Sequence, residues 1–444
     1  MGRRRVTLAE VRLWGRTIGA VSWDADRGVT FFEYDLAFRG SGIQVAPLMM
    51  PLSSEIYAFP ELSRETFYGL PGLLADSLPD RFGNALINAW LASEGRSEGS
   101  LNAVERLCYT GHRGMGALEF EPVQGPTHKG SRPIDIGALV SLASEILSQH
   151  EGLAASFDGA IKTEALADIL RVGTSAGGAR AKAVIAWNPA TGEVRSGQLE
   201  AGSGFSDWML KFDGVAGNQD KELEDAQGFG RIEYAYHKMA VAAGVEMSEC
   251  RILKEGGRHH FMTKRFDRGP GGEKFHMQTL CAMAHYDFNQ AGAHSYEQVL
   301  QVMRRLGLPM RSKEQQFRRM VFNIVARNQD DHVKNIAYRM DRAGNWSLAP
   351  AYDVVYSFNP AGRWTGQHQI SLNGKRDHFE VADFVAWAAT ASMKRGRAQA
   401  ILDEVRETVR NWPDFAEQAG VSARRAEQIA ATHRIKLDER GRLS

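Results

Sequence analysis

The most informative part of this sequence is Asn328-Gln329-Asp330-Asp331-His332-Val333-Lys334-Asn335, which gathers carboxylate, amide, imidazole and ammonium groups in one short segment. Helical spacing of apolar residues over 312–327 precedes it, and the pattern of a short strand over 336–339 follows it. In the catalytic loop of a kinase, an Asp provides the base for the attacking hydroxyl, and an Asn five positions later provides an oxygen ligand for magnesium. Asp330 and Asn335 have this spacing, which predicts a phosphoryl-transfer loop.

Neighbouring side chains in this segment leave alternatives open. Asp331 competes with Asp330 for the role of base, although it lies only four residues before Asn335. His332 has no second histidine at the spacing of a zinc site, so we expect it to order the loop or to face the substrate. Lys334 either reaches a phosphate or is solvated. The whole segment would also suit a plain turn, because Asp and Asn are common where helices end.

A second carboxylate for magnesium is expected further along the chain. Asp353, in Leu348-Ala349-Pro350-Ala351-Tyr352-Asp353-Val354-Val355, lies eighteen residues beyond Asn335 and follows a predicted hairpin that turns at Ala343-Gly344-Asn345. Kinases hold magnesium with such a carboxylate, the amide of the catalytic loop and the phosphates of the nucleotide. We therefore predict Asn335 and Asp353 as metal ligands.

A glycine-rich segment lies upstream, at Val172-Gly173-Thr174-Ser175-Ala176-Gly177-Gly178-Ala179-Arg180-Ala181-Lys182. Its glycines allow backbone N–H groups to turn toward an anion, which favours a phosphate-binding loop, with a plain loop as the alternative. It is not a Walker A loop, because Gly178 is followed by Ala179 and not by Lys and Ser or Thr. The residues expected to contact a nucleotide here are Ser175, Ala176, Gly177, Gly178, Ala179 and Lys182.

A lysine on an apolar strand is a further expected phosphate ligand. Lys211 lies in Trp208-Met209-Leu210-Lys211-Phe212, where a buried ammonium group needs a partner. Glu233, on the helix that follows, is the expected partner. The alternative is that this strand lies at the edge of its sheet and that Lys211 reaches solvent.

The pattern along the chain predicts an α+β fold with two lobes. Alternating apolar residues predict a small antiparallel sheet over 5–40, and helical spacing follows over 63–93. The next part has the element order of a kinase small lobe. Its predicted elements are strands over 183–187 and 208–212, a helix from about 222 to 243 and a hairpin that turns at Gly256-Gly257. Further helices are predicted over 296–306, 312–327, 380–391, 396–411 and 422–436.

Three units are expected from these changes in pattern. Residues 1–125 form an N-terminal α+β subdomain, 126–270 a small lobe with the glycine-rich loop, and 271–444 a mainly helical C-terminal lobe with the catalytic loop. At 444 residues the chain is long enough to bury a large core without structural disulfides.

Composition excludes several classes of protein. The 54 basic and 53 acidic side chains nearly balance, which gives no overall field for nucleic acid or anionic membranes. The 3 cysteines include no CxxC pair, which favours a reducing compartment without structural zinc. No stretch approaches ~18 consecutive apolar residues, and the first residues lack the apolar core of a signal peptide. We therefore expect a soluble cytoplasmic protein with no membrane partner.

Taken together, these segments resemble the HipA family, whose members are kinases that act as toxins in bacterial toxin-antitoxin pairs. The similarity runs over nearly the whole chain and includes the two motifs described above. Its other features are Leu78-Pro79-Asp80-Arg81, Arg113-Gly114-Met115-Gly116-Ala117-Leu118, Phe266-Asp267-Arg268 and Tyr352-Asp353.

The resemblance implies a Ser/Thr protein kinase that uses ATP and Mg2+. It implies Asp330 as base, Asn335 and Asp353 as magnesium ligands, and Lys211 on the ATP phosphates. Phe266 and the backbone around Lys264 would line the adenine. Ser175 would be autophosphorylated, with Thr174 as the neighbouring possibility, and two added negative charges there would repel ATP.

The resemblance also implies partners. The protein substrate would be an aminoacyl-tRNA synthetase, and a HipB-like helix-turn-helix antitoxin would hold the chain and bring it to DNA. Two other functions stay open from the sequence. One is a small-molecule phosphotransferase, and the other is a non-catalytic corepressor bound to an antitoxin-DNA complex.

Overall fold

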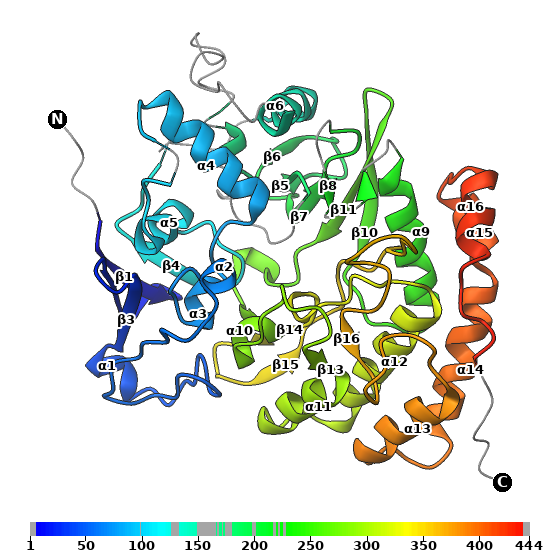
Figure 1. Ribbon diagram of the computed structural model, residues 1–444. Coiled ribbons are helices and arrows are strands. Elements are labelled where there is room, and N and C mark those ends of the chain that lie inside the picture. Colours follow the sequence, from blue (N-terminus) through cyan, green and yellow to red (C-terminus); the bar gives the residue numbers. More distant parts are fainter. Residues whose placement is uncertain are drawn as a thin grey trace.

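The computed structural model describes residues 6–97, 99–125, 133–148, 166, 168–170, 172–173, 180–197, 201–215, 219–220, 223–224 and 228–437. The predicted nucleotide contacts from Ser175 to Ala179, with the predicted phosphorylation site, lie outside these residues. The described part combines mainly antiparallel sheets with separate groups of helices (Figure 1), which confirms the predicted α+β class.

The N-terminal part contains the predicted small sheet, which has four antiparallel strands in the order β3-β2-β1-β4. Along β1, Ala9, Val11 and Leu13 are buried and the residues between them are not, as expected for a sheet with one face on a core. The strands are β1 (Leu8–Leu13), β2 (Arg16–Asp24), β3 (Val29–Tyr34) and β4 (Leu118–Glu121). The helices of this part are α1 (Leu36–Arg39), α2 (Arg64–Phe67), α3 (Gly72–Ala75), α4 (Arg81–Ser93) and α5 (Ala103–Thr110).

Proline and aspartate divide the helical spacing over 63–93 into three helices. Pro71 precedes α3, where its fixed φ suits the entry to a helix. Asp80 is the N-cap of α4, and its side chain accepts a hydrogen bond from the Gly83 N–H at 2.7 Å. The cap fixes Asp80 at the start of α4, a helix that packs against the small lobe.

The small lobe is built on a five-stranded antiparallel sheet in the order β10-β11-β7-β5-β6. Because β7 lies in the middle, the alternative that Lys211 sits on an edge strand is wrong. Gly256 and Gly257 have φ of 52° and 79°, the left-handed values that a two-residue hairpin turn requires, so the predicted hairpin is confirmed. The elements are α6 (Ile136–Ser148), β5 (Lys182–Trp187), β6 (Val194–Ser196), β7 (Ser206–Lys211), β8 (Gln219–Asp220), β9 (Leu223–Glu224), α9 (Phe229–Ala242), β10 (Cys250–Glu255) and β11 (Arg258–Lys264).

The helix predicted to begin near residue 222 begins later, at Phe229. Residues Leu223–Glu224 instead pair with β8 as a short strand. Gly228 precedes the helix with a φ of 100°, a left-handed conformation that cannot continue a right-handed helix backwards. The shorter α9 packs against β10 and β11.

The C-terminal lobe is mainly helical, as predicted. Its helices are α10 (Leu280–Ala284), α11 (Tyr296–Arg305), α12 (Met310–Val325), α13 (Val381–Thr390), α14 (Arg397–Arg410), α15 (Trp412–Gln418) and α16 (Ala423–Ala430). Its strands are β12 (His276–Thr279), β13 (His294–Ser295), β14 (Ala337–Met340), β15 (Trp346–Leu348) and β16 (Ile370–Ser371). Short 3-10 turns cover Pro270–Gly272 and Val333–Asn335.

Two expectations for the last helices were wrong. The sequence pattern missed α15, which follows α14 almost directly because Trp412-Pro413 starts a new helix. The final helix was predicted to reach residue 436, but α16 ends at Ala430. Beyond it the chain turns back, and the Arg434 N–H donates to the Val325 carbonyl at the end of α12. In Figure 1 these helices line one side of the molecule, opposite the N-terminal sheet.

Two hydrophobic cores hold these parts together, and neither follows the predicted units. Phe82 and Leu86 of α4 share a core with Ile185 and Leu210 of the small-lobe sheet. The N-terminal strands share the other core with the C-terminal lobe. The N-terminal part therefore packs against both lobes, and the boundaries at 125 and 270 stay a prediction. Within the described ranges, no helix is both long and apolar enough to cross a membrane.

Buried histidines make the stability of this fold sensitive to acid. His276 is 1% exposed, and burial lowers its pKa to about 4. Between that value and ~6.5 the unfolded chain binds a proton that the folded chain does not, so stability falls as the pH is lowered. Between pH 7 and pH 5 we expect the wild type to lose about 2 kcal/mol more free energy of unfolding than His276→Gln, because the variant lacks this titrating group. Denaturant unfolding at the two pH values measures the difference. An equal loss in wild type and variant would contradict this.

Candidate active site

A cavity of about 800 Å³ opens between the N-terminal part, the small lobe and the C-terminal lobe. Every described residue that the sequence marked as catalytic or cofactor-binding lines it. These residues are Lys182, Lys211, Lys264, Phe266, Asp330, His332, Lys334, Asn335 and Asp353. The fold thus brings together side chains that are far apart in the sequence.

The catalytic loop leaves the end of α12 in a fixed conformation. Arg327 has a φ of 59°, so the chain turns sharply after the helix, and the loop ends in the 3-10 turn Val333–Asn335. The side-chain N–H of Asn335 donates to the backbone carbonyl of Asp330 at 2.7 Å. This hydrogen bond uses the nitrogen of the amide and leaves its oxygen as the group able to bind a cation.

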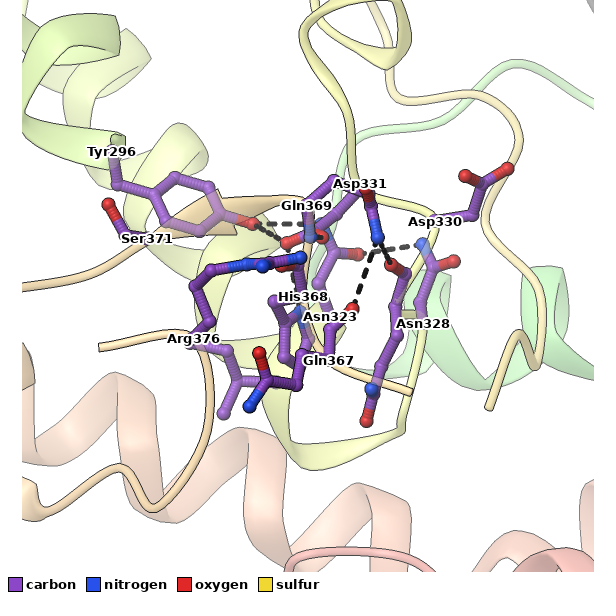
Figure 2. Close-up of polar contacts among 12 residues, drawn as sticks. Tyr296, Asn323, Asn328, Asp330, Asp331, Gln367, His368, Gln369, Ser371 and Arg376 are labelled. Atoms are coloured by element: carbon purple, nitrogen blue, oxygen red, sulfur yellow. Dashed lines mark hydrogen bonds and ion pairs between the residues drawn. The ribbon is translucent and has the colours of Figure 1, made fainter. Parts of the chain in front are cut away.

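The two neighbouring aspartates of the loop have different surroundings. Asp331 is 3% exposed and points into the protein, whereas Asp330 lines the cavity. Figure 2 shows Asp331 among Tyr296, His368 and Gln369, with the Asp330 carboxylate pointing away from that group. Of the two carboxylates that the sequence left open, Asp330 is the one that a substrate in the cavity can reach.

Asp331 anchors the loop through three hydrogen bonds. It accepts from the Tyr296 hydroxyl at 2.6 Å, from His368 Nδ1 at 2.9 Å and from the Gln369 N–H at 2.8 Å. Burial opposes its ionisation, but these donors outweigh burial and lower the pKa of Asp331.

His368 continues this anchor toward the end of the chain. Its Nε2 lies 2.8 Å from the Arg434 guanidinium. A guanidinium group can only donate, so His368 Nε2 accepts the hydrogen bond from Arg434. The ring proton is therefore on Nδ1, which donates a hydrogen bond to Asp331. Burial lowers the pKa of His368, which favours this neutral form. The segment after α16 therefore stabilises the loop 328–335 through the contacts of Arg434 with His368 and of His368 with Asp331.

Lys211 joins the two lobes at the other side of the cavity. Its Nζ lies 2.5 Å from a Glu233 oxygen on α9 and 2.5 Å from an Asp353 oxygen in the C-terminal lobe. The predicted pairing of Lys211 with Glu233 is confirmed. Burial alone would lower the pKa of Lys211, but the two carboxylates outweigh it and raise that pKa, so the group is an ammonium.

Asp353 has a strained backbone. Its φ is 52°, a left-handed value that non-glycine residues rarely adopt. Burial would raise its pKa, but Lys211 and Lys182 outweigh burial and lower it, so the side chain is a carboxylate. A charged group in an unfavourable conformation at a cavity wall is typical of a functional position.

Lys182 has a partner that the sequence did not indicate. Its Nζ lies 3.1 Å from Asp80 at the start of α4, and both side chains are less than 5% exposed. This buried ion pair links the N-terminal part to the first residue of β5. Lys182 still lines the cavity, where its charge acts on Asp353.

Aromatic groups connect the two chain segments that carry the oxygen ligands. The Tyr352 hydroxyl donates to the Lys334 carbonyl at 2.5 Å, which holds the residue before Asp353 against the catalytic loop. The centres of the Phe266 and Tyr352 rings lie 5.8 Å apart at the cavity wall. Apolar side chains that line the cavity with them include Met209, Met247, Phe261 and Val354.

The remaining loop residues lie on the side of the cavity near the N-terminal part. Lys334 Nζ lies 4.6 Å from the centre of the Phe288 ring, and the His332 and Phe288 rings are 5.5 Å apart. His332 Nε2 is 3.9 Å from Asp330. The ring contact and this short distance agree with the loop-ordering or substrate-side position expected for His332.

The oxygen groups fit magnesium only with help from a ligand. Among the residues that the structure describes, no group of three or more His, Cys, Asp or Glu side chains can hold a metal ion. Asn335 and Asp353 offer an amide oxygen and a carboxylate at the same cavity, and magnesium commonly takes one or two such ligands with phosphates and water. The residues therefore suit a metal that arrives with a nucleotide.

The fold and this site define a two-lobed, kinase-like protein. A model of the HipA-like C-terminal domain matches residues 174–432, and a model of the HipA N-terminal domain matches residues 9–121. The chain belongs to the HipA toxin family, as its sequence motifs led us to expect.

Comparison with solved structures supports the same fold. HipA of Shewanella oneidensis MR-1, solved as a toxin-antitoxin complex with HipB and its operator DNA, matches with a TM-score of 0.63. The match covers 95% of this chain and 94% of that one at 18% identity. The Helicobacter pylori proinflammatory kinase CtkA matches 51% of this chain and 92% of its own at 11% identity, and its TM-score of 0.31 is too low to support an argument. No curated protein matches the sequence.

The two aspartates should differ in their effect on stability. Asp331→Ala leaves the Tyr296 hydroxyl and the His368 N–H without their buried acceptor, and we expect it to lower the free energy of unfolding by about 3–5 kcal/mol. Asp330→Ala should lower it by less than about 1 kcal/mol. Urea unfolding of both variants measures this, and an equal loss of stability would show that Asp331 is not the anchor.

Proposed function

We propose that this chain is an ATP- and magnesium-dependent serine/threonine protein kinase. The observation that carries the proposal is the meeting of Lys211, Asp330, Asn335 and Asp353 around one cavity between two lobes. Each has the chemical type that phosphoryl transfer requires, and the Asn335 and Lys211 side chains are already held in position by hydrogen bonds.

Asp330 is the proposed base. Its carboxylate orients the hydroxyl of the substrate and accepts its proton as the new oxygen–phosphorus bond forms, while the bond to the β-phosphate oxygen breaks and ADP leaves. Asn335 and Asp353 would hold magnesium together with the phosphates, and the bound cation would supply positive charge to the transferred group. His332 and Lys334 line the same cavity as Asp330, and we assign them to the substrate side of the site.

Lys211 is the proposed phosphate ligand. Its ammonium group lies between two carboxylates, and phosphate oxygens would add acceptors of the same charge. Glu233 keeps the ammonium in place from α9, as the corresponding ion pair does in protein kinases. Phe266, Tyr352 and the backbone near Lys264 form the wall for the base of the nucleotide.

We further propose the biological setting from the family. The chain would act as a growth-inhibiting toxin in the cytoplasm, be held by a HipB-like helix-turn-helix antitoxin and meet DNA through that antitoxin. An aminoacyl-tRNA synthetase is the proposed substrate, and Ser175 is the proposed site of autophosphorylation, with ATP and Mg2+ as cofactors. The fold shared with the Shewanella HipA supports the antitoxin partner.

Incubation of the purified protein with labelled ATP and magnesium tests the proposal. We expect label on Ser175, and on a synthetase when a cell lysate is added, with both signals reduced at least about 100-fold in Asp330→Asn. Mass spectrometry locates the label. Binding of an ATP analogue should be unchanged in this variant, because Asp330 is not placed on the nucleotide.

The same assay separates the alternatives. Label that appears only on added small molecules would instead support a small-molecule phosphotransferase. Absence of label from every acceptor would support a non-catalytic corepressor, and unchanged turnover in Asp330→Asn would refute the assignment of the base.

The role of Lys211 has its own test. Lys211→Met removes the ammonium group, and we expect phosphoryl transfer to fall about 100-fold or more. Lys254→Met is the matched control, since Lys254 lies on the same sheet but is exposed at β10. Initial rates with labelled ATP measure both, and equal rates in the two variants would contradict the assignment of Lys211.

A further inference from the structure

The Asp330 carboxylate has a partner that neither the sequence motifs nor the family models point to. The indole N–H of Trp364 donates to Asp330 Oδ1 at 2.6 Å. Trp364 lies thirty-four residues after Asp330, in the irregular segment between β15 and β16. The contact is therefore a product of the tertiary structure and not of local chain geometry.

Three further hydrogen bonds hold this tryptophan in place. The Gln369 side chain donates to the Trp364 carbonyl, and the Gln329 side chain donates to the Thr365 carbonyl at 3.1 Å. Gln369 is itself fixed to Asp331 through its backbone N–H. The segment 364–369 is thus tied on both sides to the catalytic loop, and the indole N–H is oriented before any substrate arrives.

The chemistry of the indole suits the positioning of a base. An indole N–H can only donate, and it does so at every pH at which the protein folds. A donor held on one carboxylate oxygen limits rotation of the Asp330 side chain. Misplacement of a reacting group by ~1 Å can lower the reaction rate about 100-fold, so loss of this hydrogen bond should give a measurable decrease in rate.

We infer that Trp364 is a positioning residue that fixes the Asp330 carboxylate for proton abstraction. The inference rests on the proposed kinase function, because it assigns Asp330 the role of base. Trp364 acts through Asp330 and does not itself take part in the transfer. It makes the segment after Asp353 part of the catalytic apparatus, although that segment has no regular secondary structure from 357 to 369.

Replacement of the donor, with the ring size nearly kept, tests the inference. In Trp364→Phe we expect kcat for phosphoryl transfer to fall between about tenfold and 100-fold, while KM for ATP stays within about twofold. Trp346→Phe is the matched control. Its indole donates to the Gln44 carbonyl at 3.1 Å, away from the catalytic loop, so both parameters should stay near wild type.

A second measurement does not depend on activity. The indole N–H resonance of Trp364, assigned by its loss in Trp364→Phe, should shift in Asp330→Ala because its acceptor is gone. An active wild type with an equally active, folded Trp364→Phe would overturn the inference and leave the kinase proposal intact. An unmoved indole resonance in Asp330→Ala would also overturn it. A wild type that transfers no phosphate to any acceptor would refute the kinase proposal. It would also refute the positioning role of Trp364, because that role assumes that Asp330 is the base.

Discussion

A partly buried ammonium group shared by two carboxylates is the interaction on which the site depends. Lys211 Nζ contacts Glu233 and Asp353, at 2.5 Å each, and so connects the central strand of the small lobe, helix α9 and the C-terminal lobe. Charges removed from water are tolerated only when they are paired, so the two lobes are held in one arrangement across the cavity. Lys182 adds a second positive charge that acts on Asp353 and helps to keep it ionised, so a divalent cation that enters with a nucleotide would meet a carboxylate.

The catalytic loop shows how neighbouring residues of one type are given different tasks. Asp331 turns inward, where hydrogen bonds from three donors use both of its oxygens, and Asp330 turns outward to the cavity. The inward carboxylate fixes the backbone from which the outward one extends. Because the C-terminal segment reaches Asp331 through Arg434 and His368, the position of Asp330 depends on packing near the C-terminal end of the described chain.

Much of the grouping at this cavity could be predicted from the sequence, because the residue types and spacings match those that kinases use. That match predicted the grouping of Asp330, Asn335 and Asp353 at one cavity and the pairing of Lys211 with Glu233. Trp364, His368 and the Asp80 partner of Lys182 could not be predicted. They lie in segments without periodic patterns, or reach across lobes, and only the folded chain brings them to the loop. The late start of α9 and the early end of α16 have a similar cause, since a left-handed glycine and a long-range backbone hydrogen bond overrode the local helical pattern.

The most direct test of this account is a crystal structure of the chain with magnesium and a non-hydrolysable ATP analogue. We expect the cation to lie ~2.1 Å from the Asn335 amide oxygen and from an Asp353 oxygen, with the Lys211 ammonium on the phosphates. A nucleotide bound outside the cavity, or a cation that contacts neither Asn335 nor Asp353, would contradict the account.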